Sequence, residues 1–223
     1  MEVAANLEWI QEKIGQACAR SGRNPDDITI IGVTKYVTIE RTKEAIDAGV
    51  KNLGENRNEG FLEKHSHIGN QAKWHFIGSL QSRKVKDIID KIDALHSLDR
   101  MSLANEINKR ATVPIDCFVQ VNVSGEESKH GLEPEEVIPF IEKVEQYAHI
   151  RVVGLMTMAP HIDDPDQIRK VFRNLAQLRD RIRGKNWTHA PCEYLSMGMS
   201  NDYEIAVEEG ATHIRIGSKL VGS

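Results

Sequence analysis

The sequence predicts a single (βα)8 barrel preceded by an N-terminal helix. Two observations carry this prediction: short runs rich in β-branched residues alternate with stretches of helical composition, and eight such runs occur in 223 residues. Alternation of this kind implies parallel strands joined by right-handed crossovers. Eight units in a chain of this length fit a closed barrel better than a doubly wound open sheet, which is the alternative. We therefore expect one barrel domain over residues 1–223.

The first element is a helix, because Leu7, Ile10, Ile14 and Ala17 recur at helical spacing before the turn residues 21–25. Short apolar runs that follow are predicted as the eight strands, at residues 28–33, 50–53, 74–77, 94–97, 115–123, 150–156, 193–196 and 213–216.

The clearest of the intervening helices follows Asp164 and Pro165, an N-cap acid with proline at the first helical position. Its apolar residues between 168 and 182 share one face, which should cover the sheet.

Composition excludes several classes of function. Charged residues form 28% of the chain and the net charge is -4, so no basic field attracts nucleic acid or an anionic membrane. Cys18, Cys117 and Cys192 are odd in number and widely spaced, which argues against a disulfide framework and a zinc site. The N-terminus lacks an apolar run long enough for a signal peptide or membrane span. We expect a cytoplasmic protein.

Glycine and serine gather where the last two predicted strands end. In a barrel, the loops that follow the last two strands frequently bind phosphate. Gly198, Ser200, Gly217 and Ser218 have the composition of an anion cradle, since glycine lets amides approach and serine adds a hydroxyl donor. The alternative is that these are ordinary turn residues.

Lys35 is a charged residue at the end of the apolar first strand. Desolvation and a neighbouring cation such as Arg215 would favour the neutral, nucleophilic amine that a Schiff base requires. The alternative is a lysine that extends from the barrel mouth into water.

Seven motifs in order cover nearly the whole chain: residues 32–35, 54–57, 74–81, 121–124, 154–158, 196–200 and 215–218. Together they resemble the YggS/PROSC family of pyridoxal 5′-phosphate (PLP)-binding proteins, which has the barrel of alanine racemase and eukaryotic ornithine decarboxylase.

The resemblance implies that Lys35 holds PLP as a Schiff base, while Arg215 faces the pyridine nitrogen. It also implies a phosphate site and a set of residues that line the ring or the cavity. The phosphate site would be formed by Ser200, Gly217 and Ser218 with the backbone of Ser196, Met197, Gly198 and Met199, and the lining residues would be Asn56, His75, Ser79 and Met156.

Three functions follow from these residues. The resemblance implies a monomeric protein of PLP homeostasis that buffers the cofactor or delivers it to PLP-dependent apo-enzymes, without robust catalysis. The second is a weak PLP-dependent amino-acid racemase, which Arg215 disfavours because a guanidinium only donates hydrogen bonds and weakens the ring as an electron sink. If strand alternation persists past Lys35, Tyr36 also points to the other side of the strand. The third is a cofactor-free phosphate-binding isomerase with Glu55 as base.

Two other lysines, Lys84 and Lys129, are interpreted as solvated surface charges, although Lys129 could assist PLP loading or release. Glu126, Glu127 and His130 share a loop at a spacing unspecific for metal ligands, so we predict no metal.

Overall fold

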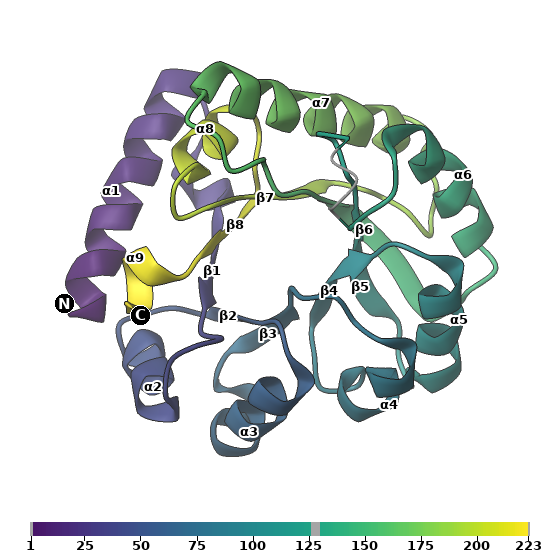
Figure 1. Cartoon of the computed structure of the whole chain (residues 1–223), viewed down its shortest axis with the longest axis horizontal. Helices are drawn as coiled ribbons and strands as arrows, with labels where there is room; N and C mark the ends of the chain where they lie inside the picture. The colour runs from purple at the N-terminus through teal and green to yellow at the C-terminus, as the bar shows by residue number, and fades with distance from the viewer. Residues whose placement is uncertain (1, 126–129, 223) are drawn as a thin grey trace.

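The computed structural model describes residues 2–125 and 130–222. Eight strands form a closed barrel in which β1 pairs with β2, each strand pairs with the next, and β8 returns to β1. The β1–β8 seam is parallel and pairs Thr29 with His213 and Gly32 with Ile216. Figure 1 shows the barrel surrounded by helices. The predicted (βα)8 barrel with a preceding helix is confirmed.

The strands are short and lie close to their predicted positions. Their bounds are β1 Thr29–Val33, β2 Asn52–Glu55, β3 Lys73–Phe76, β4 Ala94–Leu98, β5 Ile115–Gln120, β6 Ile150–Met156, β7 Tyr194–Met199 and β8 His213–Ile216. The prediction of a strand over 115–123 was too long, because β5 ends at Gln120. Beyond it, the Val121 amide still donates to the Met156 carbonyl, and Val121 forms an isolated bridge with Leu132. The prediction that the seventh strand ends at Ser196 was too short, since β7 continues to Met199.

The helices alternate with the strands around the outside of the barrel. They are α1 Val3–Ser21, α2 Ile39–Asp47, α3 Asn58–Ile68, α4 Val85–Ile88, α5 Met101–Arg110, α6 Pro134–Val144, α7 Pro165–Arg183, α8 Tyr203–Glu208 and α9 Ser218–Val221, with 3-10 turns at Pro25–Asp27, Gly69–Gln71 and Ser82–Lys84. The predicted cap of α7 is present, because the Asp164 side chain accepts hydrogen bonds from the amides of Asp166 and Gln167. No helix within 2–125 and 130–222 is long and apolar enough to cross a membrane.

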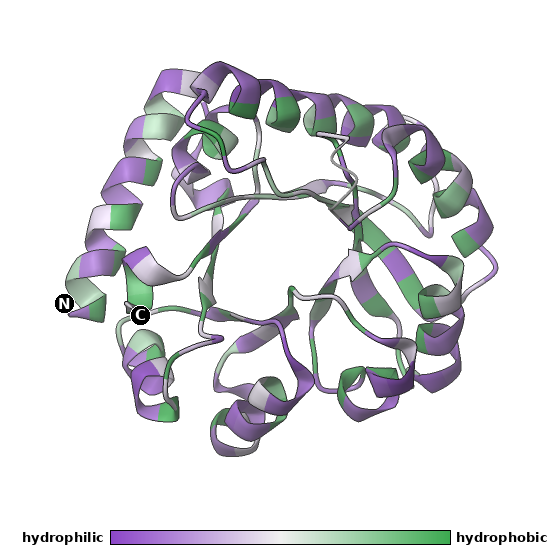
Figure 2. Cartoon of the chain, viewed as in Figure 1, coloured by the Kyte–Doolittle hydropathy of each residue, from purple (hydrophilic) through white to green (hydrophobic). Residues whose placement is uncertain are grey.

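The core has two parts. Most buried apolar residues pack between the sheet and the helices, and Figure 2 shows hydrophobic residues recurring along the outer helices. A small second cluster fills part of the barrel interior with Ala94, Phe118, Val153 and Met156. Several polar side chains are also buried, including His75, His96, Ser196 and Arg215. Buried polar groups must find hydrogen-bond partners, so their arrangement bears directly on the site.

Candidate functional site

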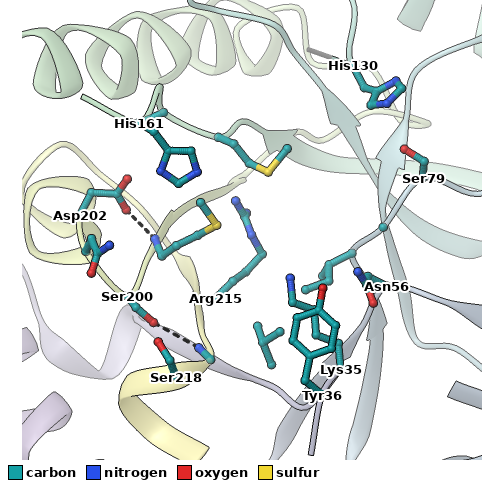
Figure 3. Close-up of a pocket in the computed structure, with 18 of the residues that line it drawn as sticks. Lys35, Tyr36, Asn56, Ser79, His130, His161, Ser200, Asp202, Arg215 and Ser218 are labelled. Carbon is teal, nitrogen blue, oxygen red and sulfur yellow. Dashed lines mark hydrogen bonds between the residues drawn. The ribbon is translucent and has the colours of Figure 1, made fainter. Parts of the chain in front are cut away.

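A cavity of about 550 Å³ lies at the carboxyl ends of the strands, within the range of small-molecule sites. Eight predicted site residues line it: Lys35, Asn56, Ser79, Met199, Ser200, Arg215, Gly217 and Ser218. In Figure 3, Ser200 and Ser218 lie together on one side, Lys35 and Tyr36 lie on another, and Arg215 lies between them. Residues from the first and last strands therefore meet in one space.

The other predicted residues lie beneath this cavity or beside it. Met156 and Met197 are buried in the apolar core. His75 and Ser196 are also buried, and their side chains hydrogen bond with neighbouring strands. Gly198 lies within β7 with φ +96°, and an added Cβ there would lie 2.6 Å from the Cβ of Ala206. These residues can support the cavity wall, although they do not form its surface.

At the Gly-Ser end of the cavity, the segment that follows β7 meets the segment that follows β8. The Gly217 amide donates to Ser200 Oγ at 3.4 Å, and Ser218 follows directly. Gly198 lies within β7 where the register between β7 and β8 shifts, and its positive φ favours glycine at this irregularity just before Ser200. The result is a set of hydroxyl and amide donors suited to an anion.

Lys35 and Tyr36 both line the cavity. The condition under which Tyr36 would point away from Lys35 is not met, because β1 ends at Val33 and strand alternation does not extend to these two residues. Lys35 Nζ lies 4.9 Å from the centre of the Tyr36 ring. In the described ranges, no carboxylate forms a salt bridge with Lys35. Its amine therefore faces the cavity without an anionic partner.

A buried ion pair fixes the chain just before Lys35. Lys64 Nζ donates to Glu55 Oε1 at 2.7 Å and to the carbonyl of Thr34 at 2.5 Å. The Thr34 hydroxyl donates to the same Glu55 oxygen at 2.6 Å. Glu55 is 1% exposed and does not line the cavity, so the isomerase hypothesis loses its predicted base.

Arg215 is the buried cation of the cavity, with 4% of its surface exposed. Its Nη1 donates to Ser196 Oγ, and its Nη2 donates to the carbonyl of Thr157 at 2.9 Å. Burial lowers the pKa of Arg215 to about 10, so it still carries a proton at neutral pH. Both of these acceptors are neutral, and no carboxylate of the described chain forms a salt bridge with Arg215. The Asp202 carboxylate lines the same cavity, and its charge acts on the guanidinium without a direct ion pair and opposes the lowering of its pKa.

The cavity also contains polar side chains that sequence reasoning did not predict as site residues: Gln120, His130, His161, Asn201 and Asp202. Asp202 could have been found as the cap before α8, and its carboxylate accepts from the Met199 amide at 2.6 Å. Burial raises the pKa of Asp202 above its usual range. His161 belongs to an irregular segment after β6, where its sequence position gives no comparable signal.

The remaining polar candidates lie outside this arrangement. Lys84 forms a 2.6 Å ion pair with Glu59 and does not line the cavity. Glu126, Glu127 and Lys129 lie outside the described residues. Among residues that the structure describes, no group of three histidine, cysteine or acidic side chains could hold a metal.

The chain matches a known class of protein over nearly its whole length. Residues 3–223 match the family model described as "Alanine racemase, N-terminal domain". This match spans every strand of the barrel.

More specific relatives agree over the full chain. The pyridoxal phosphate homeostasis protein of Aquifex aeolicus (strain VF5) is 41% identical, with 100% of this chain and 98% of the relative covered. The chain belongs to the family of pyridoxal phosphate homeostasis proteins.

Solved structures support the same assignment. A protein from Bifidobacterium adolescentis has a TM-score of 0.94 at 31% identity, over 98% of this chain and 94% of its own. PipY of Synechococcus elongatus PCC7942, solved with PLP bound, has a TM-score of 0.82 at 27% identity, over 96% of this chain and 100% of its own.

Proposed function

We propose that residues 1–223 form one PLP-binding domain that holds the cofactor in this cavity as a Schiff base of Lys35. The chain would take part in intracellular PLP homeostasis by buffering the cofactor or delivering it to PLP-dependent apo-enzymes. The cytoplasm as its compartment and the monomer as its state are expectations from the sequence.

One observation carries the proposal: a lysine amine without an anionic partner shares a cavity with a Gly-Ser cradle and a buried arginine held by neutral acceptors. A phosphorylated aldehyde needs an amine for its carbonyl and donors for its phosphate. Lys35, Ser200 and Ser218 provide these groups from different ends of the cavity. The donor set therefore fits PLP.

Each residue would have a distinct task. Ser200, Gly217 and Ser218 would hold the phosphate, while Arg215 would face the ring. The PLP aldehyde supplies the reactive carbon when the cofactor is bound. The Lys64–Glu55 pair would position Lys35 by fixing the adjoining Thr34 carbonyl.

Holding the cofactor requires less of the site than catalysis does. Arg215 remains protonated at neutral pH and can only donate hydrogen bonds. It therefore favours an unprotonated pyridine nitrogen, which weakens PLP as an electron sink. A reversible bond to Lys35 needs no strong electron sink, so this charge arrangement suits a carrier.

The test is borohydride reduction of protein mixed with PLP, followed by mass spectrometry of its peptides. We expect reduction to fix the cofactor on the Lys35 peptide and to abolish exchange with free PLP. Lys35→Ala should lose this adduct, whereas the matched variant Lys84→Ala should keep it.

An unmodified Lys35 peptide after reduction of saturated wild type would overturn the Schiff-base proposal. Modification spread equally over surface lysines would do the same, since it would show reaction of PLP with exposed amines.

A weak amino-acid racemase is the second candidate, favoured by the position of Tyr36 in the cavity beside Lys35. Racemisation requires proton transfer at the α-carbon. Incubation of PLP-loaded protein with L-alanine in heavy water measures this exchange by NMR. Our proposal predicts no more α-exchange than free PLP gives, and exchange lost in both Lys35→Ala and Tyr36→Phe would instead establish the racemase.

A further inference from the structure

A row of polar side chains crosses the barrel interior from Arg215 to β2. Ser196 Oγ lies 2.8 Å from His96 Nδ1, and His96 Nε2 lies 2.9 Å from His75 Nδ1. His75 Nε2 then lies 3.0 Å from Asn52 Oδ1. Ser196 and His96 are fully buried, and His75 is 6% exposed. This row, termed the histidine chain, begins at the serine that accepts from Arg215.

One assignment of protons satisfies every step of the histidine chain. Arginine only donates hydrogen bonds, so Ser196 Oγ accepts one from Arg215. The Ser196 hydroxyl can then donate its own hydrogen bond to His96 Nδ1. His96 then carries its proton on Nε2 and donates to His75 Nδ1. His75 in turn donates from Nε2 to Asn52 Oδ1. The tautomers follow from this network, with the Asn52 oxygen facing His75.

Both rings are neutral in this assignment. Burial and the nearby cationic groups lower the pKa of His75 to about 3 and the pKa of His96 well below its usual range. His213 is a further titratable ring, with its centroid 6.3 Å from that of His96. The histidine chain thus gives Arg215 a hydrogen-bond acceptor that carries no negative charge.

We infer that Ser196 and His96 are positioning residues, which hold the Arg215 guanidinium in place through neutral groups and leave its positive charge available to the ligand. A carboxylate at Ser196 would also hold the guanidinium but would neutralise it. Nη2 is fixed separately by the Thr157 carbonyl. Two neutral acceptors therefore determine how this buried cation faces the cavity.

The inference rests on the proposed function for the identity of its ligand, PLP. Ser196→Ala removes the acceptor of Arg215 and the donor to His96 with little change in volume. Because hydrogen bonds to charged groups are among the stronger ones, we expect PLP affinity to fall by about ten- to a hundredfold.

Ser97, a buried residue of β4, provides a matched control. It is 2% exposed, and its hydroxyl has no hydrogen-bond partner in the described structure. Ser97→Ala should change PLP affinity by no more than about twofold. An equal loss in the two variants would overturn the inference, since it would show a general disturbance of the barrel.

The second readout is the nitrogen NMR spectrum of ligand-free protein labelled at histidine. His75 and His96 should both carry their proton on Nε2 and gain no second proton between about pH 8 and pH 5. In Ser196→Ala the His96 nitrogen shifts should change, while Ser97→Ala should retain the wild-type tautomers.

A proton on His96 Nδ1 in the wild type, or wild-type PLP affinity in Ser196→Ala, would overturn the inference. Failure of the wild type to bind PLP would instead refute the proposed function. The tautomers, measured without ligand, would still support or overturn the histidine chain.

Discussion

The molecule buries two cations near its cavity and treats them differently. Lys64 contacts the carboxylate of Glu55, and both side chains are almost fully buried. Arg215 is equally buried but contacts a serine hydroxyl and a backbone carbonyl. A buried charge that is neutralised within the protein can serve structure alone. A buried cation held by neutral acceptors keeps its positive potential, so an anionic ligand can bind beside it and balance the charge.

The largest effect on stability is expected when the buried Lys64–Glu55 ion pair is broken. Lys64→Met leaves the Glu55 carboxylate buried without its cation, which should lower the free energy of unfolding by about 3–5 kcal/mol. Urea denaturation measures this loss. The double variant Lys64→Met with Glu55→Gln should recover part of it because no buried charge remains. A loss below about 1 kcal/mol in the single variant would show that water reaches the pair.

Acid should lower the stability of the fold through the buried histidines near Arg215. His75 and His213 have pKa values lowered by burial to about 3 and about 4, against an ordinary value of 6.5. The unfolded chain therefore takes up protons first, and stability falls as pH drops from about 6.5 toward these values. Each such histidine contributes a slope of up to about 1.4 kcal/mol per pH unit.

Urea denaturation of wild type at several pH values below 6.5 measures this slope. His213→Phe should reduce it by the contribution of one proton, because phenylalanine does not titrate. The new ring can keep the contacts with Phe118 and Tyr194, although it loses the hydrogen bond between His213 and the Thr212 hydroxyl. Equal slopes for the two proteins would show that the pKa of His213 is the same in the folded and unfolded states.

Arg215→Met should separate binding from stability. It removes a buried charge but leaves the Ser196 hydroxyl and the Thr157 carbonyl without their donor, so the two effects oppose each other. We expect a change of no more than about 2 kcal/mol in the unfolding of ligand-free protein, together with at least about tenfold weaker PLP binding. Denaturation as severe as in Lys64→Met would contradict the distinction between the two cations.

The smallest effect concerns an exposed cation. Arg173 forms an ion pair with Glu209, and 57% of its side chain is exposed. Solvent screening and side-chain entropy offset such pairs. Arg173→Ala should therefore leave the urea midpoint unchanged within error, with the buried variant Lys64→Met as the contrast. A clear loss that disappears in high salt would show that its ion pairs act as a network.

The sequence predicted the elements better than the side-chain directions. The strands β6 and β8 have the predicted bounds because apolar runs and turn residues define both of their ends. The end of β1 was less evident, since Thr34 and Lys35 can continue a strand as well as leave one. Two residues at this boundary decide whether Tyr36 faces the cavity.

Residues at strand ends, such as Lys35 and Ser200, were predicted to reach the site because the barrel brings those ends together. His75 and Ser196 were harder to place. Their strands expose one face to the barrel interior, but only the register between strands shows how deep each side chain lies. The histidine chain joins four strands, and no local pattern in the sequence predicts contacts across such distances.

The β1–β8 seam has a consequence for biosynthesis. Lys35 follows the first strand, whereas Arg215, Gly217 and Ser218 belong to the last strand or follow it directly. Before β8 is synthesised, a nascent chain contains the Lys35 amine. It still lacks the Arg215 guanidinium and the Gly217 and Ser218 part of the anion cradle. Under the proposed function, cofactor capture therefore comes after translation of β8, and loading with PLP marks a polypeptide whose barrel has closed.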